Sequence, residues 1–297
     1  MVIGWLLGDV RELIGRVFRT EEYLRAAGRL QSATFSWREP PTSHRQAPAG
    51  TGRHRQAPAL SSRCLSRSAR DVSAVCDDPA RFRETRAGGF MSFGFKTSWL
   101  AVRDAGPEEL ADALDLRHRQ RIDWETGTEL AYRQGVFVAR PVPEWTLAHG
   151  RFHLTHGTDA AHPDFPSWLR ALAARVGDLQ YFHTERVTDY HAWAKVESGE
   201  LTRAYCYIGM SGEIPLRQGE PTAIERELGV GLVGWEEVRQ DWGEAEWDAW
   251  HDAMPTERQV MRIAADWSVC PPMIEDGSVT GPGILGFPPG VEPVRPF

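Results

Sequence analysis

The 297-residue chain divides into a basic and an acidic part. Residues 1–90 contain 15 arginines and nine acidic residues, a net charge of +6, so residues 91–297 keep 19 of the 34 basic and 32 of the 41 acidic residues, a net charge of −13. A body this acidic repels phosphate backbones, which argues against DNA or RNA as its partner and favours a basic protein. No apolar run approaches the ~20 residues that cross a bilayer, so no membrane association is predicted.

The basic part predicts two kinds of segment. Residues 1–30 predict an amphipathic helix, because Ile3, Leu7 and Val10 begin an apolar stripe at helical spacing. Residues 31–90 are rich in Arg, Ser, Ala and Pro and repeat one hexapeptide at 44–49 and 54–59. Such a composition buries too little apolar surface to fold, so we expect a disordered leader and a natural start near Met91.

Residues 91–276 predict a single domain of mixed strands and short helices. Strands are expected over 95–102, 145–154, 179–184, 189–197 and 201–209. Helices are expected after Pro107, over 164–176 before Gly177, and after Thr222 and Thr256, which both begin capping boxes. Without repeating βαβ units, this order favours an α+β fold, a mostly antiparallel sheet with helices packed on one face. The Gly- and Pro-rich residues 277–297 predict an irregular tail.

Several catalytic and cofactor signatures are missing. The chain has two lysines, neither after a phosphate loop, and no asparagine, which excludes Walker-type nucleotide hydrolysis and a Cys-His-Asn protease. Gly229–Gly234 matches G-x-G-x-x-G, but it follows a helix instead of a strand, so we interpret it as a helix C-cap and loop. The four cysteines form no C-x-x-C, and no secretory signal is evident. We therefore expect a cytoplasmic protein without a cofactor.

One segment, residues 180–193, concentrates titratable and aromatic side chains around a turn between two predicted strands. The candidates for acid–base catalysis are His183, Glu185, Arg186 and His191. The candidates for ligand binding are Tyr181, Tyr190 and Trp193. The alternative is structural: an Arg–Glu pair and packed tyrosines that hold a hairpin together.

Two further groups of residues admit a functional interpretation. His149 and His153, four residues apart on a predicted strand, are candidate zinc ligands, with solvated surface histidines as the alternative. The segment 235–252 holds four tryptophans among seven acidic residues. Tryptophans can stack on ligands, but we favour a role in pinning helices onto the sheet.

The body also resembles a known family of uncharacterised bacterial proteins, of actinobacterial type. The segment Tyr190-His191-Ala192-Trp193 carries most of the resemblance, and Phe95-Lys96-Thr97 and Gly212-Glu213 extend it. The resemblance implies an established domain over about residues 93–267, with the leader outside it and no assigned activity.

The sequence therefore favours a non-catalytic cytoplasmic binding or interaction protein, such as a toxin-neutralising or regulatory module, whose acidic surface meets a basic partner. The alternative is a small hydrolase or transferase that uses the histidines and Glu185 of the segment 180–193, with or without a metal.

Overall fold

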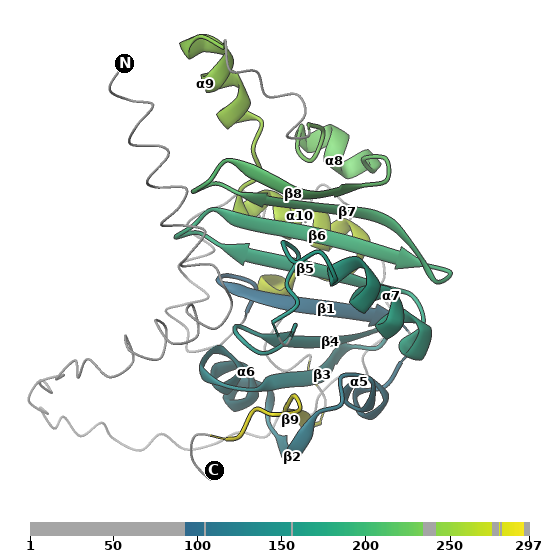
Figure 1. Cartoon of the computed structure of the whole chain (residues 1–297). Coiled ribbons are helices and arrows are strands. Elements are labelled where there is room, and N and C mark those ends of the chain that lie inside the picture. The colour runs from purple at the N-terminus through teal and green to yellow at the C-terminus, as the bar shows by residue number, and fades with distance from the viewer. Residues whose placement is uncertain are drawn as a thin grey trace, which may run out of the picture. The chain divides into compact units, whose positions relative to one another are not determined.

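The computed structural model of the chain (Figure 1) describes residues 93–103, 105–155, 157–233, 242–274, 279 and 281–293. The helix predicted within 1–30 and the leader predicted over 31–90 lie outside these residues. The described part is built on one antiparallel sheet of nine strands, in the order β2-β9-β3-β4-β1-β5-β6-β7-β8. The strands are β1 (Thr97–Arg103), β2 (Arg117–Ile122), β3 (Val136–Val142), β4 (Trp145–Gly150), β5 (Leu179–Glu185), β6 (Tyr190–Glu197), β7 (Glu200–Ile208), β8 (Glu213–Gln218) and β9 (Gly283–Phe287).

Helices cover both faces of this sheet. One face carries α5 (Pro107–Ala113) and α7 (Phe165–Val176), and the other carries α6 (Trp124–Arg133), α8 (Ala223–Leu228) and α10 (Glu257–Trp267). The predicted α+β fold with a mostly antiparallel sheet is confirmed, but the placement of helices on one face alone is wrong. The central strands β1 and β4 show that both faces are covered, because almost every residue of both strands is buried. A strand with one solvent-exposed face would instead alternate between buried and exposed residues. The described residues also form α9 (Glu244–Asp252) and a short 3-10 helix, η2 (Pro271–Met273).

A row of side chains crosses the sheet on the face that α6 and α10 cover. Direct cross-strand pairing aligns one residue of each strand, in the order Gln120, Leu285, Phe137, His149, Trp99, Phe182, Trp193, Tyr205 and Arg217. We call the six rings from Phe137 to Tyr205 the aromatic row. Its closest stacks join Trp99 to Phe182 and Trp193 to Tyr205, with ring centroids 5.1 Å and 4.9 Å apart. Because cross-strand ring pairs stabilise one pairing over its shifted alternatives, the row helps to fix the register of the sheet.

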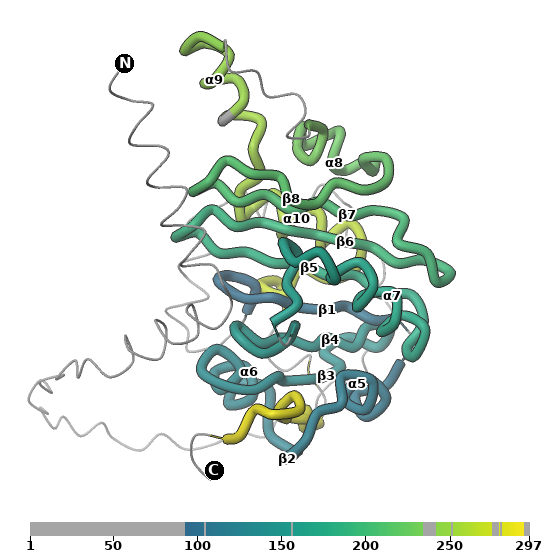
Figure 2. Tube along the Cα trace, viewed as in Figure 1, coloured from purple at the N-terminus to yellow at the C-terminus, as the bar shows by residue number. Residues whose placement is uncertain are grey.

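The C-terminal segment contains a strand that the sequence did not predict. β9 lies between β2 and β3 and is buried throughout, and the yellow trace beside β2 in Figure 2 follows it. The irregular tail predicted over 277–297 is therefore wrong for Gly283–Phe287. The glycines of β9 allow neighbouring side chains to approach its backbone closely. A β-carbon on Gly283 would overlap the Phe137 ring, and one on Gly286 would come within 2.9 Å of Leu116.

The predicted helix ends are largely confirmed. Thr222 and Thr256 each form a capping box, with Glu225 and Gln259 respectively, so α8 and α10 begin where the spacing indicated. Gly177 is the C-cap of α7, with a φ of 84°. In the part of the chain that the structure describes, no helix combines the length and the apolar character needed to cross a membrane.

Both edge strands carry features that hinder pairing with another strand. β2 is exposed over most of its length and contains Arg117, Arg119 and Arg121. β8 contains Pro215, which has no N–H to donate. Charges and proline at a sheet edge oppose strand addition.

Gly283→Ala should destabilise the protein, because the added methyl group must displace the ring of buried Phe137. Overpacking of this kind costs about 1–3 kcal/mol, which urea unfolding of the full chain would measure. Gly106→Ala is the control, because there a methyl group would meet only the flexible Glu109 carboxylate at 3.4 Å. Equal stabilities of the two variants would contradict the packing of β9 described above.

Candidate functional site

The four predicted catalytic residues do not form one site. His183 pairs across the strands with Ala192, and His191 pairs with Thr184. Neighbouring residues of a strand point to opposite faces, so the imidazole of His183 lies on the α7 face and that of His191 on the α10 face. Tyr181 and Trp193, predicted to bind a ligand, are both fully buried and likewise lie on opposite faces. The sheet itself separates these residues.

On the α7 face, His183 belongs to a small polar cluster. Its Nδ1 is hydrogen-bonded to Ser98 Oγ at 2.8 Å, and the Tyr181 hydroxyl donates to the same oxygen at 3.3 Å. The ring of Tyr190 lies 4.2 Å from the His183 ring, while Nε2 is buried without a partner. Burial lowers the pKa of His183 to about 3, and nearby His191 adds to the effect. This imidazole is therefore neutral at physiological pH.

The other groups of this cluster are also held in their neutral forms. Tyr190 accepts a hydrogen bond from the Ala161 N–H at 3.1 Å. Burial raises the pKa of both the Tyr190 hydroxyl and the Cys206 thiol well above their usual values. A buried thiol with a raised pKa is a poor nucleophile, so neither the Cys206 thiol nor the neutral His183 imidazole is an activated group.

Glu185 and Arg186 take part in ion pairs at the end of the sheet. Glu185 lies 3.4 Å from Arg151 and 4.0 Å from Lys96, measured between nitrogen and oxygen atoms. Arg186 Nε lies 3.1 Å from Glu257 Oε2 at the start of α10. Burial raises the pKa of Glu257, against the opposing effect of Arg186. These contacts tie the end of β5 and the β5–β6 turn to the residues that flank β1 and β4 and to α10, so the partners of Glu185 and Arg186 lie outside the hairpin.

His191 and the candidate zinc ligands do not assemble into a metal site. Burial lowers the pKa of His191 to about 4 against the opposing effect of Asp189, 3.8 Å away. His149 is buried in the aromatic row, and burial lowers its pKa to about 3. The expectation that His153 shares its strand face is wrong, because β4 ends at Gly150 and His153 accepts a hydrogen bond from the Gly135 N–H instead. Within the described ranges, no group of three His, Cys, Asp or Glu side chains is arranged to hold a metal ion.

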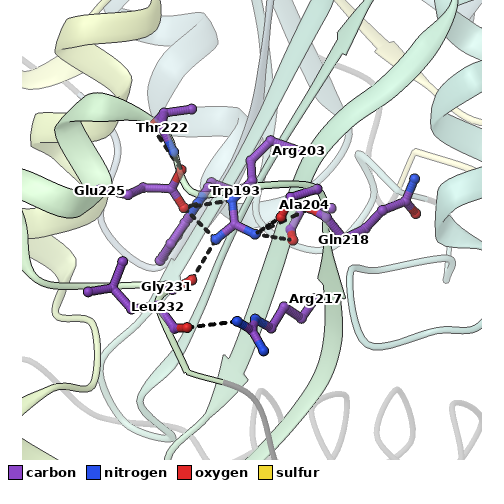
Figure 3. Close-up of polar contacts among 10 residues, drawn as sticks. Trp193, Arg203, Ala204, Arg217, Gln218, Thr222, Glu225, Gly231 and Leu232 are labelled. Atoms are coloured by element: carbon purple, nitrogen blue, oxygen red, sulfur yellow. Dashed lines mark hydrogen bonds and ion pairs between the residues drawn. The ribbon is translucent and has the colours of Figure 1, made fainter.

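The strongest polar arrangement of the described residues was missed by the sequence analysis. Arg203 of β7 and Glu225 of α8 form an ion pair in which both side chains are at most 1% exposed (Figure 3). Glu225 Oε1 accepts from Arg203 Nε at 2.8 Å, from Arg203 Nη2 at 2.6 Å and from Trp193 Nε1 at 2.7 Å. Its Oε2 accepts from the Thr222 N–H and hydroxyl. Two features of the sequence could have indicated this pair: Arg203 lies among apolar residues of its strand, and Glu225 belongs to a capping box.

The same ion pair accounts for the glycine-rich segment. Arg203 also donates to the backbone oxygens of Gly219 and Gly231. A β-carbon on Gly231 would lie 2.8 Å from Glu225 Oε1 and 2.7 Å from the Trp193 ring. Gly229 has the left-handed conformation of a helix C-cap, as predicted, and Gly234 lies outside the described residues. The glycines therefore allow the loop to approach a buried ion pair, where the G-x-G-x-x-G pattern would have it approach a phosphate.

α9 presents the most one-sided charge of the described helices. It carries Glu244, Glu246, Asp248 and Asp252, all exposed, and no Lys or Arg. No ion pair joins these four carboxylates to any described residue. Trp250 is buried in the core and Trp242 packs against it, with centroids 5.7 Å apart. The predicted core role of the tryptophans is confirmed for these two, while Trp235 lies outside the described residues.

Comparisons of the chain with family models, with curated proteins and with solved structures find no match.

Acid should destabilise the protein through its buried histidines. His149, His183 and His191 have pKa values of about 3, 3 and 4 in the folded state, whereas an unfolded histidine titrates near ~6.5. Below that pH the unfolded chain binds more protons, so the free energy of unfolding falls between about pH 6.5 and 4, by up to ~1.4 kcal/mol per pH unit for each histidine.

Denaturant unfolding across this pH range measures the slope. His149→Phe replaces one imidazole by a ring of similar shape and should reduce proton uptake on unfolding by about one proton. A slope unchanged by this substitution would show that His149 is not held neutral.

The Arg203–Glu225 pair should behave as a coupled unit. Arg203→Met or Glu225→Gln alone leaves the other group buried without its partner, a loss of about 3–5 kcal/mol, and the double variant should cost less than the sum of the two. Urea unfolding of all four proteins gives the coupling energy. The exposed pair of Arg133 and Glu129 is the matched control, where the equivalent substitutions should be nearly additive. Additive costs at Arg203 and Glu225 would refute the coupling.

Proposed function

We propose that this protein is a cytoplasmic, non-catalytic binding protein whose α9 end engages a basic protein partner. The observation that supports this proposal is the acidic surface of α9. Glu244, Asp248 and Asp252 follow one another at four-residue intervals, so they lie along one side of the helix. We call these three carboxylates the acidic stripe.

The setting of α9 makes the stripe available to a partner. The helix lies beyond β8 at the top of Figure 1, apart from the helices that cover the sheet. Its inner side is held by Trp250, which belongs to the core together with Met254 of the following turn. Ala245 and Ala249 are exposed beside the stripe and leave room for a partner to approach closely.

The spacing of the stripe defines the partner's chemistry. A helix rises 1.5 Å per residue, so successive carboxylates are separated by roughly 6 Å along the axis. Lys or Arg side chains at similar spacing would pair with them, and the net charge of −13 on residues 91–297 would accelerate the encounter. A toxin-neutralising or regulatory module would use such a surface.

The arrangement of the candidate catalytic residues supports a binding role more than a catalytic one. His183 and His191 lie on opposite faces of the sheet, and burial holds both imidazoles neutral. Glu185 and Arg186 are engaged in ion pairs with other elements. General acid–base chemistry needs such groups to converge on one reacting centre, and these do not.

Charge reversal on α9 tests the proposal. The full chain with Glu244→Lys, Asp248→Lys and Asp252→Lys should lose its partner, because each carboxylate that attracts a cation becomes a repelling charge. The partner is first captured from native cells at low ionic strength and identified. Purified partner and protein are then titrated by calorimetry at rising salt. We expect a basic partner, at least 10-fold weaker binding by the α9 variant, and weaker binding by the natural chain at high salt.

The control variant carries Glu125→Lys, Glu144→Lys and Glu200→Lys. These carboxylates are exposed on α6, the β3–β4 turn and β7, and their reversal changes the net charge by the same amount. It should retain most of the affinity. A partner that is acidic, or that loses affinity equally for both variants, would overturn the proposal.

A further inference from the structure

Phe93 lies inside a cage of aromatic rings on the α6 face of the sheet. Its ring is stacked on His149, with centroids 4.1 Å apart and an interplanar angle of 6°. Trp99 meets it edge-on at 6.3 Å, and Trp124 of α6 lies 5.9 Å away. The Phe93 side chain is 1% exposed, so this ring is enclosed by rings from β1, β4 and α6.

The rings that surround Phe93 carry polar atoms without partners. Trp99 Nε1, Trp124 Nε1 and both nitrogens of His149 are buried and accept or donate no hydrogen bond within the described chain. The hydroxyl of Thr128, one helical turn after Trp124, is also buried without a hydrogen-bond partner. Each unsatisfied buried polar atom costs about 1–3 kcal/mol, and folded proteins contain few of them. Three of the side chains that carry these atoms, Trp99, Trp124 and His149, lie against one phenyl ring, which offers no acceptor, and this requires an explanation.

The same sheet shows how an indole nitrogen is normally satisfied. Trp193, in the aromatic row with Trp99, donates from Nε1 to Glu225 at 2.7 Å. No equivalent carboxylate or carbonyl of the described residues reaches Trp99 or Trp124. The cage therefore has stacking faces, two N–H donors and an imidazole, and it lacks a group that would use them.

We propose that the position of the Phe93 ring is a binding site for a flat, uncharged, single-ring nitrogen heterocycle of the size of a pyrimidine base, which Phe93 occupies in the unliganded protein. Such a ring would stack on His149 as the phenyl ring does. Its edge nitrogens or oxygens would accept from the two indoles, as a phenyl edge cannot.

The electrostatics of the cage favour an uncharged ligand. Burial lowers the pKa of His149 to about 3, so its ring carries no charge at neutral pH. Among the described residues, no arginine or lysine lies over Phe93, Trp99, Trp124 or His149. A nucleotide would bring its phosphate charge without a cation to meet it, whereas a free base would not.

Phe93 directly precedes the point at which the chain is hydrogen-bonded to β5. Gly94 follows it with a φ of 123°, a conformation open chiefly to glycine. The Gly94 carbonyl accepts from the Thr184 hydroxyl at 2.7 Å, and the Lys96 N–H donates to that hydroxyl at 3.1 Å. The chain is therefore fastened to β5 from Gly94 onward, whereas no hydrogen bond among the described residues joins Phe93 to the sheet. Competition from Phe93 would lower the apparent affinity of the natural chain for the ligand.

Removal of the phenyl ring tests the proposal with two probes of matched shape. The full chain, natural and Phe93→Ala, is titrated by calorimetry with pyrimidine and with benzene, which differ in their ring nitrogens. We expect Phe93→Ala to bind pyrimidine at least 10-fold more tightly than the natural chain does, and more tightly than it binds benzene. A folded variant that prefers benzene, or that binds neither probe, would show that the cage is ordinary apolar core.

A second pair of variants keeps the test decisive if Phe93→Ala does not fold. Phe93→His places a flat ring with nitrogens in the cage, whereas Phe93→Leu places an apolar side chain of similar size there. If the orphaned donors select a polar-edged ring, Phe93→His should melt at the higher temperature. The opposite order, expected for a purely apolar core, would overturn the proposal.

Discussion

The central strands of this sheet have no face in contact with water, so each polar side chain on them depends on a partner inside the protein. Arg203 meets this requirement in full, through Glu225 and the backbone oxygens of the loop around Gly231. Ser98 and Tyr181 meet it by bonding to one another and to His183. Trp99 of β1 does not meet it, and neither does Trp124 of α6, which packs onto the same face of the sheet. This difference separates a structural ion pair from a candidate ligand cage.

Local signals predicted much of the fold, because helix caps and short hairpins depend on residues that are near one another in sequence. The capping boxes at Thr222 and Thr256 are of this kind. α6 escaped prediction because Gly127 and Thr128 interrupt its helical pattern, although Gly127 is there to admit the ring of Phe137. β9 escaped because its glycines suggested a loop, and only its neighbours in the sheet show why they are needed.

The candidate site could be predicted less well than the fold, since it depends on cross-strand register. The histidines of residues 180–193 are close in sequence, and that proximity suggested a common site. The pairing of His183 with Ala192, set by the four-residue turn between β5 and β6, places them on opposite faces. Residues such as Phe93 and Trp124 come together only through tertiary packing, which no local pattern encodes.

The position of β9 has a consequence for how the protein is made. Among the described strands, β2 pairs only with β9, and Arg117 of β2 lies opposite Phe287, so these two strands are about 170 residues apart in sequence. A nascent chain on the ribosome holds β2 long before its hydrogen-bonding partner has been synthesised. Contacts of such long range slow folding. The sheet must therefore be completed late in biosynthesis, and until then one edge of β3 remains open to other chains.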